Sequence, residues 1–260
     1  MIITFLSDLG ISDATVAAAK AAMSRHVPGA VIIDISHHVT QYDVQQAAYL
    51  LLSAYSHFPA GTVHVAAIEV FSGNSPRMLV AAYEEHYFVV PDNGLLQLAF
   101  REKLSTAGVA YTLRQPHSFA DWTDNAGKII AAINAGDTAQ YEPLQLKPMP
   151  RTLNMQSMPH AIDCNVLYVD RYGNVVLDIT KEEFHDVVRD RPFKIKMPRM
   201  QDMTAVSDNY NNVPEGGALC RFNMAGYLEI AINHGTAATQ LGLDPYKTGN
   251  LRYKNIRIFL

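Results

Sequence analysis

The chain opens with MIITFLSDLGISD, residues 1–13, and its fold class can be worked out from this stretch. The apolar run at residues 2–6 predicts a buried strand, and a helix is expected to open near Ser12 and Asp13. In an open α/β sheet, ligands bind just outside the carboxyl ends of the strands. Asp8 and Asp13 therefore arrive where a small polar ligand would bind. A turn role for Asp8 and a helix cap for Asp13 fit the same residues.

The residue types at this position restrict the ligand. A carboxylate accepts hydrogen bonds from a ribose diol or pairs with an ammonium group. It repels a phosphate, and the segment has no glycine-rich loop of the kind that holds phosphates. The opening stretch thus favours a ligand with hydroxyl or ammonium groups.

Composition excludes several classes of protein. The 260 residues carry 21 basic and 25 acidic side chains, a net charge of −4, and no basic run. This balance argues against a nucleic-acid surface, which needs clustered Lys and Arg. The two cysteines, Cys164 and Cys220, are too few for a disulfide framework or a zinc site. With no signal-like or membrane-spanning segment, a soluble cytoplasmic protein is expected.

Residues 1–140 alternate between strand-like and helix-like segments. Helices are expected at 13–26, 42–55 and 125–135, and strands at 2–6, 30–35 and 62–70, with a hairpin pair at 78–83 and 86–90. Such alternation predicts an α/β domain with a mainly parallel sheet covered by helices on both faces.

The pattern of expected elements changes after residue 140. Prolines at 143, 148, 150 and 159 mark residues 141–162 as a linker between two domains. Residues 163–260 follow as short β-rich segments, which predict an antiparallel β-barrel domain. In the strand-like segment 227–233 the alternation places Glu229 toward solvent.

A loop after the third expected strand carries a second pair of candidates. Glu69 precedes the loop and Arg77 follows it. The two could form a buried pair that holds a water or a charged substrate, or a surface ion pair worth under about 1 kcal/mol. No metal site is expected, because His37 and His38 are adjacent and cannot share one face of a helix or strand. No G-x-S-x-G nucleophile elbow occurs.

Six segments, in order along almost the whole chain, resemble the family of S-adenosylmethionine (SAM) hydroxide adenosyltransferases, relatives of the halogenating fluorinase and chlorinase. They are SDLG with Asp13 (residues 7–13), DISH with YDV (34–44), FPAGTVHV (58–65), PDNGLL (91–96), YVDRYGN (168–174) and GYLEIAINHG (226–235). Any one segment is weak, but six in register are specific.

The resemblance implies a homotrimer of two-domain subunits, with the ligand between the first domain of one subunit and the second domain of its neighbour. It also implies roles for individual residues. Asp8 would hold the ribose hydroxyls, and Asp13 and Asp170 the methionyl ammonium. The other substrate-binding residues implied are Tyr42 beside the ribose, Tyr210 stacked on adenine, Asn174 at the adenine edge, and Thr15, Tyr172 and Asn223.

The catalytic positions depart from the family pattern. Hydroxide-using members carry an Asp-Pro-Gly-Val-Gly loop, a nearby Arg, and a Phe-His-Gly-Arg-Asp run. Here the loop begins Glu69-Val70-Phe71, Arg77 lies near the expected place, and Ala120 occupies the histidine position. An Asn-Ser pair that helps hold the methionyl carboxylate in relatives is Asn223-Met224 here.

The expected reaction is slow hydrolysis of SAM to adenosine and L-methionine by water attack at the ribose C5′. Glu69, held by Arg77, would orient the water, with Asp121 or His117 as candidates to replace the missing histidine. SAM is the substrate and no cofactor is expected. The alternative is a non-catalytic adenosyl-binding protein, which Ala120 and Met224 favour. Halogenation is disfavoured because the Glu69 charge would repel a halide.

Overall fold

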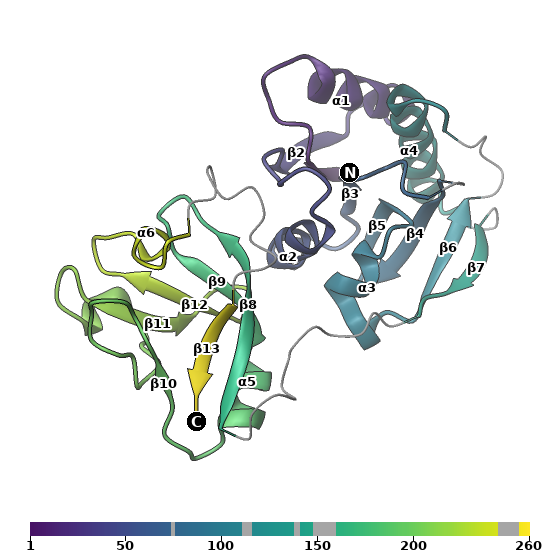
Figure 1. Cartoon of the computed structure of the whole chain (residues 1–260). Helices are drawn as coiled ribbons and strands as arrows, with labels where there is room; N and C mark the ends of the chain where they lie inside the picture. Colours follow the sequence, from purple (N-terminus) through teal and green to yellow (C-terminus); the bar gives the residue numbers. More distant parts are fainter. Residues whose placement is uncertain (74–75, 111–115, 138–140, 148–159, 244–254) are drawn as a thin grey trace. The chain divides into compact units, whose positions relative to one another are not determined.

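The chain divides into two compact units, Met1–Pro150 and Arg151–Leu260 (Figure 1). The computed structural model describes residues 1–73, 76–110, 116–137, 141–147, 160–243 and 255–260. Most of the predicted linker, residues 148–159, lies outside the described residues. Each unit is described by itself below.

The first unit is built on a seven-stranded sheet of order β2-β1-β3-β5-β4-β6-β7. Its strands are β1 (Ile2–Ser7), β2 (Val31–Ser36), β3 (Val63–Ala67), β4 (Met78–Tyr83), β5 (His86–Pro91), β6 (Thr106–Ala110) and β7 (Tyr141–Gln145). The pairs β1/β2, β1/β3 and β3/β5 are parallel, and the pairs β4/β5, β4/β6 and β6/β7 are antiparallel.

The prediction of a mainly parallel sheet is therefore wrong, because half of the sheet is antiparallel. The change comes at the β4–β5 hairpin, whose two-residue turn is Glu84-Glu85, with φ values of 48° and 61°. Two successive residues with positive φ form the tight turn that joins antiparallel neighbours. From β5 outward, the strands β4, β6 and β7 continue that pattern.

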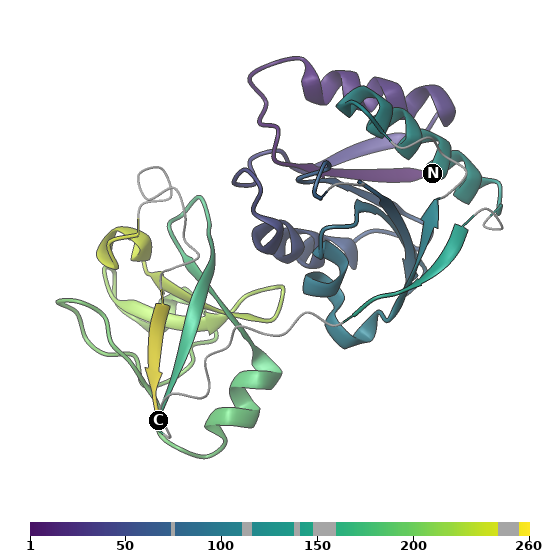
Figure 2. The ribbon, with the colours of Figure 1, turned by 45° about the vertical axis from the view of Figure 1, so that its right-hand side comes forward.

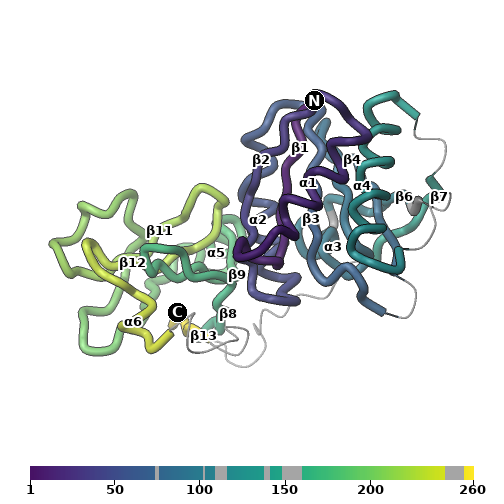
Figure 3. The backbone as a smooth tube through the Cα atoms, turned by 90° about the horizontal axis from the view of Figure 1, so that it is seen from above, coloured from purple at the N-terminus to yellow at the C-terminus, as the bar shows by residue number. Residues whose placement is uncertain are grey.

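Helices cover both faces of this sheet, as Figures 1 and 3 show for the purple-to-teal part of the chain. They are α1 (Thr15–His26), α2 (Val44–Tyr55), α3 (Leu95–Phe100), the 3-10 turn η1 (Arg101–Lys103) and α4 (Phe119–Asn134). Ile3 and Phe5 of β1 pack with α1 and α4, whereas Leu6 packs with α2 and α3. A strand buried on both faces is what the apolar run at residues 2–6 predicts.

Strand β7 occupies the start of the segment that was expected to be linker. It pairs with β6 at the edge of the sheet, and Pro143 lies opposite Gly108. An edge strand tolerates proline because the missing N–H would have faced away from the sheet. Proline density therefore marks an edge strand here as well as the connection that follows it.

The second unit is a six-stranded antiparallel sheet of order β10-β13-β8-β9-β12-β11. Its strands are β8 (Ala161–Val169), β9 (Val175–Thr180), β10 (Lys194–Ile195), β11 (Ala218–Phe222), β12 (Tyr227–Ile232) and β13 (Asn255–Phe259). Helix α5 (Lys181–Val188), the short helix α6 (Ala237–Gln240) and the 3-10 turn η2 (Tyr210–Asn212) complete it.

This sheet curls, as Figure 2 shows for its green and yellow strands, and among the described residues no continuous ladder closes it into a barrel. Single bridges join its two edges to one intervening segment: Ile195 of β10 pairs with Met203, and Cys220 of β11 pairs with Val206. The prediction of an antiparallel β-domain is confirmed, in the form of a curled sheet packed around one apolar core. Among the described residues, no helix is both long and apolar enough to cross a membrane.

Candidate functional site

The loop after β1 is fastened to the loop after β2. The Tyr42 N–H donates to Asp8 Oδ2 at 3.0 Å, and the Gly10 N–H donates to the His37 carbonyl at 2.7 Å. Tyr42 has a φ of 62° and its side chain is 66% exposed. A bulky residue in this region of φ is strained, which is common at functional sites. The structure thus brings Asp8 and Tyr42 together at the carboxyl edge of the sheet.

His37 is a buried support for this edge that the sequence reasoning missed. Its Nδ1 lies 2.7 Å from Ser7 Oγ, and its Nε2 lies 3.1 Å from Asp34 Oδ1 without the angle of a hydrogen bond. The order Ser7–His37–Asp34 resembles a hydrolytic triad. Because Ser7 and His37 are both buried, no substrate reaches the hydroxyl, and the group fixes the strand ends instead.

Asp13 has a local partner at the start of α1. Its Oδ1 accepts from the Thr15 N–H at 2.8 Å, and hydrogen bonds from Thr15 hold the pKa of this carboxyl below its usual value. Asp13 is exposed, so its second oxygen remains accessible to solvent or ligand. The N-cap of α1 is Ala14, so Asp13 is the residue before the cap, and its hydrogen bond from Thr15 is compatible with a binding role.

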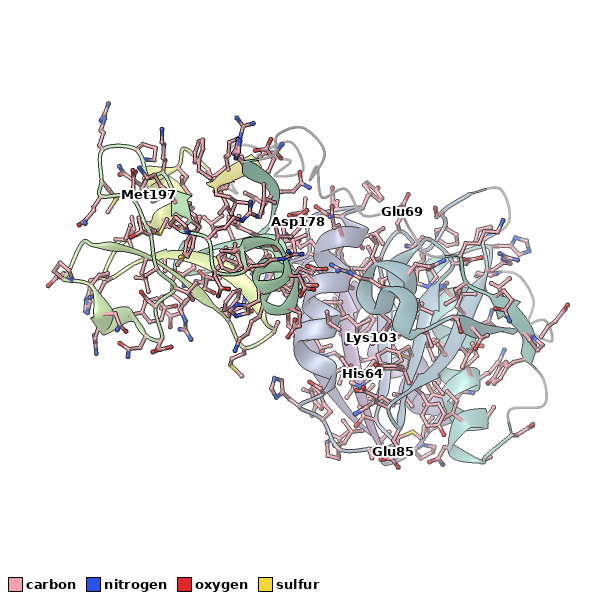
Figure 4. The ribbon with its side chains drawn as sticks, turned by 90° about the horizontal axis from the view of Figure 1, so that it is seen from below. His64, Glu69, Glu85, Lys103, Asp178 and Met197 are labelled. Carbon is pink, nitrogen blue, oxygen red and sulfur yellow. The ribbon has the colours of Figure 1, made fainter. Side chains whose placement is uncertain are left out.

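Glu69 lies two residues after the end of β3 and has a strained backbone, with φ at 44°. No described residue makes a hydrogen bond or ion pair with its half-buried carboxylate. Asn93, in the loop after β5, donates from Nδ2 to the Ile68 carbonyl at 2.8 Å and so ties the two loops together. Figure 4 labels Glu69 at one end of the sheet and Glu85, in the β4–β5 turn, at the other.

The expected pairing of Arg77 with Glu69 is not found. Arg77 donates from Nε to Asp92 Oδ2 at 2.9 Å, and its Nη2 contacts the same oxygen. The cause is the hairpin register: Met78 pairs with Pro91, so Arg77 and Asp92 are the next positions facing each other across β4 and β5. Opposite charges at facing positions attract across a pair of strands.

The position of the missing histidine lies in the first turn of α4. Ala120 is exposed, and Asp121 is used in capping. Ser118 accepts from the Asp121 N–H at 3.1 Å, and Asp121 Oδ2 accepts from the His117 N–H at 3.2 Å. Hydrogen bonds to the Asp121 carboxyl from the Ser118 side chain, and then from the His117 N–H, lower its pKa. Asp121 therefore has a structural function at this helix end.

In the second unit, Asp170 is the first residue of the turn between β8 and β9. Asp170 Oδ1 accepts from the backbone N–H groups of Tyr172 and Asn174, at 2.8 and 2.9 Å. Gly173 has a φ of 78°, and a Cβ added there would lie 2.1 Å from Thr236 Cγ2. The close approach of Thr236 therefore requires glycine at this corner.

A chain of side-chain hydrogen bonds leaves this turn. Asn174 Nδ2 donates to Asp170 Oδ2 at 2.9 Å and to the Tyr210 hydroxyl at 3.2 Å, and that hydroxyl donates to Glu229 Oε1 at 3.0 Å. The structure thus brings together Asp170, Asn174 and Tyr210, which come from two separate segments. The guanidinium of Arg221 lies 5.1 Å from the centre of the Tyr210 ring.

The prediction that Glu229 faces solvent is wrong. It is 6% exposed, because every residue of β12, which lies between β9 and β11 in the sheet, is buried. Burial raises the pKa of the Glu229 carboxyl and the Asp170 charge adds to this, while Tyr210, Arg221 and Asn223 act in the opposite direction. Predicting exposure from the alternation of residues assumes that one face of the strand is exposed to solvent, and neither face of β12 is.

The remaining predicted residues lie on turns of the second unit. Asn223 Oδ1 accepts from the N–H groups of Ala225 and Tyr227, at 3.0 and 3.1 Å, and so shapes the β11–β12 turn. Tyr172 and Met224 are both strongly exposed, at 78% and 84%. Within the described part of the chain, no cluster of three or more His, Cys, Asp or Glu side chains has the geometry to hold a metal ion.

Comparisons with known proteins cover both units. Residues 3–139 match the SAM hydroxide adenosyltransferase N-terminal domain, and residues 164–248 match the C-terminal domain of the same family. The chain is 29% identical to a protein named (R)-S-adenosyl-L-methionine hydrolase from Thermus thermophilus, over 92% of this chain and 94% of that one. A protein of the same name from Methanocaldococcus jannaschii is 26% identical over 94% of this chain and 92% of its own length.

Other similarities are partial or concern the fold. A fluorinase from an Actinoplanes species is 29% identical over only 39% of this chain and 42% of its own. The crystal structure of an uncharacterized protein from Thermotoga maritima superposes with a TM-score of 0.80 at 24% identity, over 99% of this chain and all of that one. A conserved hypothetical protein from Thermus thermophilus superposes with a TM-score of 0.70 at 26% identity, over 99% of this chain and 98% of that one. With both of its domains matched in order, the chain belongs to the SAM hydroxide adenosyltransferase family.

Proposed function

We propose that this protein hydrolyses SAM to adenosine and L-methionine. The observation that carries the proposal is similarity along more than nine tenths of the chain to proteins named SAM hydrolase, against 39% for a fluorinase. A water oxygen bonds to the ribose C5′ while the C5′–S bond breaks. The electron pair of that bond goes to sulfur, which leaves as the thioether of methionine, and one proton is released.

The proposed ligand contacts come from the first unit of one subunit and the second unit of its neighbour. Asp8 accepts from the ribose hydroxyls beside the Tyr42 ring, and Asp13 and Asp170 each offer a carboxylate oxygen to the methionyl ammonium. Tyr210 stacks on adenine, and Asn174 meets its edge. Thr15, Tyr172 and Asn223 line the same ligand. The placement of Asp8 with Tyr42, and of Asp170 with Asn174 and Tyr210, supports this set. No cofactor takes part, because the sulfonium is already a good leaving group.

Glu69 is the group proposed to orient the water. Its carboxylate has no side-chain partner among the described residues, and its backbone is strained, which fits a group held ready for substrate rather than for the fold. The Arg77–Asp92 pair replaces the expected Arg77–Glu69 pair. We place that pair beside the water site, with Asn93 connecting its loop to the residue before Glu69.

Ala120 favours a second candidate, a non-catalytic adenosyl-binding protein. The α4 position expected to carry a histidine is an exposed alanine, and Asp121 is engaged in capping. Incubation with each sulfonium epimer of SAM, followed by chromatography, separates the two functions. Hydrolysis yields adenosine and methionine in equal amounts. Calorimetric binding of SAM with neither product formed would select the binding protein instead.

A homotrimer is the proposed assembly. Large apolar side chains are exposed near the proposed ligand contacts of each unit: Ile11, Tyr42 and Phe71 in the first, and Tyr172 and Met224 in the second. Contiguous apolar exposure commonly marks an interaction surface. Light scattering of the purified protein should give three times the 28.8 kDa subunit mass. A monomer that still binds SAM tightly would contradict the trimer.

The cytoplasm is the proposed location. Cys164 and Cys220 are both buried free thiols, as suits a reducing compartment. Burial raises the pKa of the Cys220 thiol to about 12, which keeps it protonated and unreactive.

A further inference from the structure

The amide of Asn174 is held between the Asp170 carboxylate and the Tyr210 hydroxyl. One of its N–H groups donates to Asp170 Oδ2 at 2.9 Å, and the other donates to the Tyr210 hydroxyl at 3.2 Å. That hydroxyl in turn donates to Glu229 Oε1 at 3.0 Å. Both amide hydrogens of Asn174 are therefore committed inside the protein.

These contacts determine which way the amide faces. A carboxylate oxygen only accepts hydrogen bonds, so the contact with Asp170 favours the nitrogen of Asn174 on that side, and the Tyr210 hydroxyl favours the same orientation as long as it accepts. No described residue donates to Asn174 Oδ1. This atom is not one of the fully buried polar atoms that lack a hydrogen-bond partner, so it is partly accessible. Asn174 therefore offers a ligand one group, a hydrogen-bond acceptor.

Glu229 sets the direction of the hydrogen bond in the middle of this chain. The Tyr210 hydroxyl has a single hydrogen, and the Glu229 carboxylate takes it, which leaves the lone pairs of the hydroxyl for Asn174. An uncharged amide at position 229 could instead donate to the hydroxyl and turn its hydrogen toward Asn174. The second amide N–H of Asn174 would then lose its acceptor.

We propose that Glu229 is a positioning residue that acts through Tyr210 to keep Asn174 Oδ1 presented as an acceptor, so that the site selects 6-amino purines over 6-oxo purines. The inference rests on the proposed function, in which Asn174 meets the edge of adenine. An acceptor in that place matches the 6-amino group of adenine. The 6-oxo group of hypoxanthine would set two acceptors against each other.

Stability alone does not account for Glu229. Burial raises the pKa of this carboxyl, so the ionised form costs folding free energy that an amide of the same shape avoids. The charged groups around it are Arg221, which faces it from β11, and Asp170, with Tyr210 and Asn223 as polar neighbours. On β9 the facing residue is the apolar Val176.

Calorimetric binding of adenosine and of inosine tests the proposal in the parent protein, Glu229→Gln, Tyr210→Phe and the double variant. The parent should prefer adenosine by at least about tenfold, the range for a buried polar group left without a partner. Either single variant should reduce that preference to about threefold or less, and the double variant should reduce it no further, because both act on one chain. Glu229→Gln should melt no lower than the parent at pH 7, unlike a change that only damages the fold.

Glu84→Gln is the matched control, since Glu84 also accepts from a tyrosine hydroxyl, that of Tyr55 at 2.9 Å, far from these residues in the sequence. It should keep the parental preference. A parental preference in both Glu229→Gln and Tyr210→Phe overturns the proposal, and Tyr210→Phe decides alone if Glu229→Gln does not fold. A parent that hydrolyses SAM but binds both nucleosides equally also overturns it. A parent that prefers adenosine without hydrolysing SAM supports this inference and defeats the hydrolase instead.

Discussion

Glu69 combines three features at one position: it follows a buried parallel strand, its φ is positive, and its carboxylate has no partner among the described residues. If it orients or partly deprotonates the attacking water, Glu69→Gln should lower kcat for SAM hydrolysis by about 10²- to 10⁴-fold, the usual contribution of a positioned base. The Kd for SAM, measured by calorimetry, should stay within about threefold. A variant with the parental kcat would remove Glu69 from the mechanism.

The Arg77–Asp92 pair is the second residue-scale feature. As a partly exposed pair it contributes under about 1 kcal/mol to folding, so Arg77→Ala should hardly move the melting temperature. If the pair shapes the water site, Arg77→Ala and Asp92→Asn should each lower kcat, and the double variant should be no slower than the slower single variant.

The second unit offers a matched control for that experiment. Arg257 donates to Asp163 through Nε at 2.6 Å and Nη2 at 2.8 Å, so the same kind of pair joins β13 to β8. Arg257→Ala should leave kcat unchanged. If it slowed the reaction as much as Arg77→Ala, a general loss of structure would explain both results.

At the scale of elements, the contact between α1 and α4 depends on Gly127. A Cβ added there would meet His26 Cδ2 at 2.6 Å and Met23 Cα at 3.1 Å. Alanine in place of a helical glycine gains about 1 kcal/mol of helix propensity, but overpacking costs about 1–3 kcal/mol. Gly127→Ala should therefore destabilise the protein by up to about 2 kcal/mol in urea unfolding, while Lys128→Ala changes it by under about 0.5 kcal/mol. A stabilised Gly127→Ala would contradict this packing.

A buried histidine pair, His64 on β3 and His86 on β5, predicts that the fold loses stability in acid. His64 Nδ1 lies 2.8 Å from Thr4 Oγ1, and His64 Nε2 lies 3.2 Å from His86 Nδ1 (His64 is labelled in Figure 4). Burial, and then the His86 charge, lower the pKa of His64 to about 3 from 6.5. Between these values the unfolded chain binds a proton that the folded chain does not, so stability falls as pH decreases from about 6.5 toward 3.

The slope from one such group approaches about 1.4 kcal/mol per pH unit. Urea unfolding of His64→Gln across this range should lose that part of the slope, whereas His57→Gln, at an exposed position, should keep it. Equal slopes in the parent and His64→Gln would show that acid sensitivity arises at other groups.

Sequence periodicity predicted single elements better than the way they pair. The strand at 2–6 and the helices near 13–26 and 42–55 correspond to β1, α1 and α2. The sequence predicts the hairpin at 78–83 and 86–90 but not the antiparallel half of the first sheet that continues from it. The two-residue turn pairs Tyr83 with His86. Counting outward from that pair along both strands places Arg77 opposite Asp92.

At the scale of the whole molecule, the candidate site residues could be named from the sequence. The residues that they contact could not, because those contacts depend on the fold. The bond from the Tyr42 N–H to Asp8 spans 34 positions, and that from Asn174 to Tyr210 spans 36. Glu229 was misplaced because local alternation says nothing of what covers the second face of a strand. Family similarity supplied the residue types of the site, and tertiary packing supplied their partners and orientation.

The central claim, that water attacks C5′ and displaces methionine, is tested most directly by incubating SAM with the protein in ¹⁸O-labelled water and analysing both products by mass spectrometry. We predict equal amounts of adenosine and methionine, with one ¹⁸O in the 5′-hydroxyl of adenosine and none in methionine. Glu69→Gln, run in parallel, should form the same labelled product more slowly. Unchanged SAM, adenosine without the label, or a 5′-halogenated nucleoside in the presence of chloride would contradict the claim.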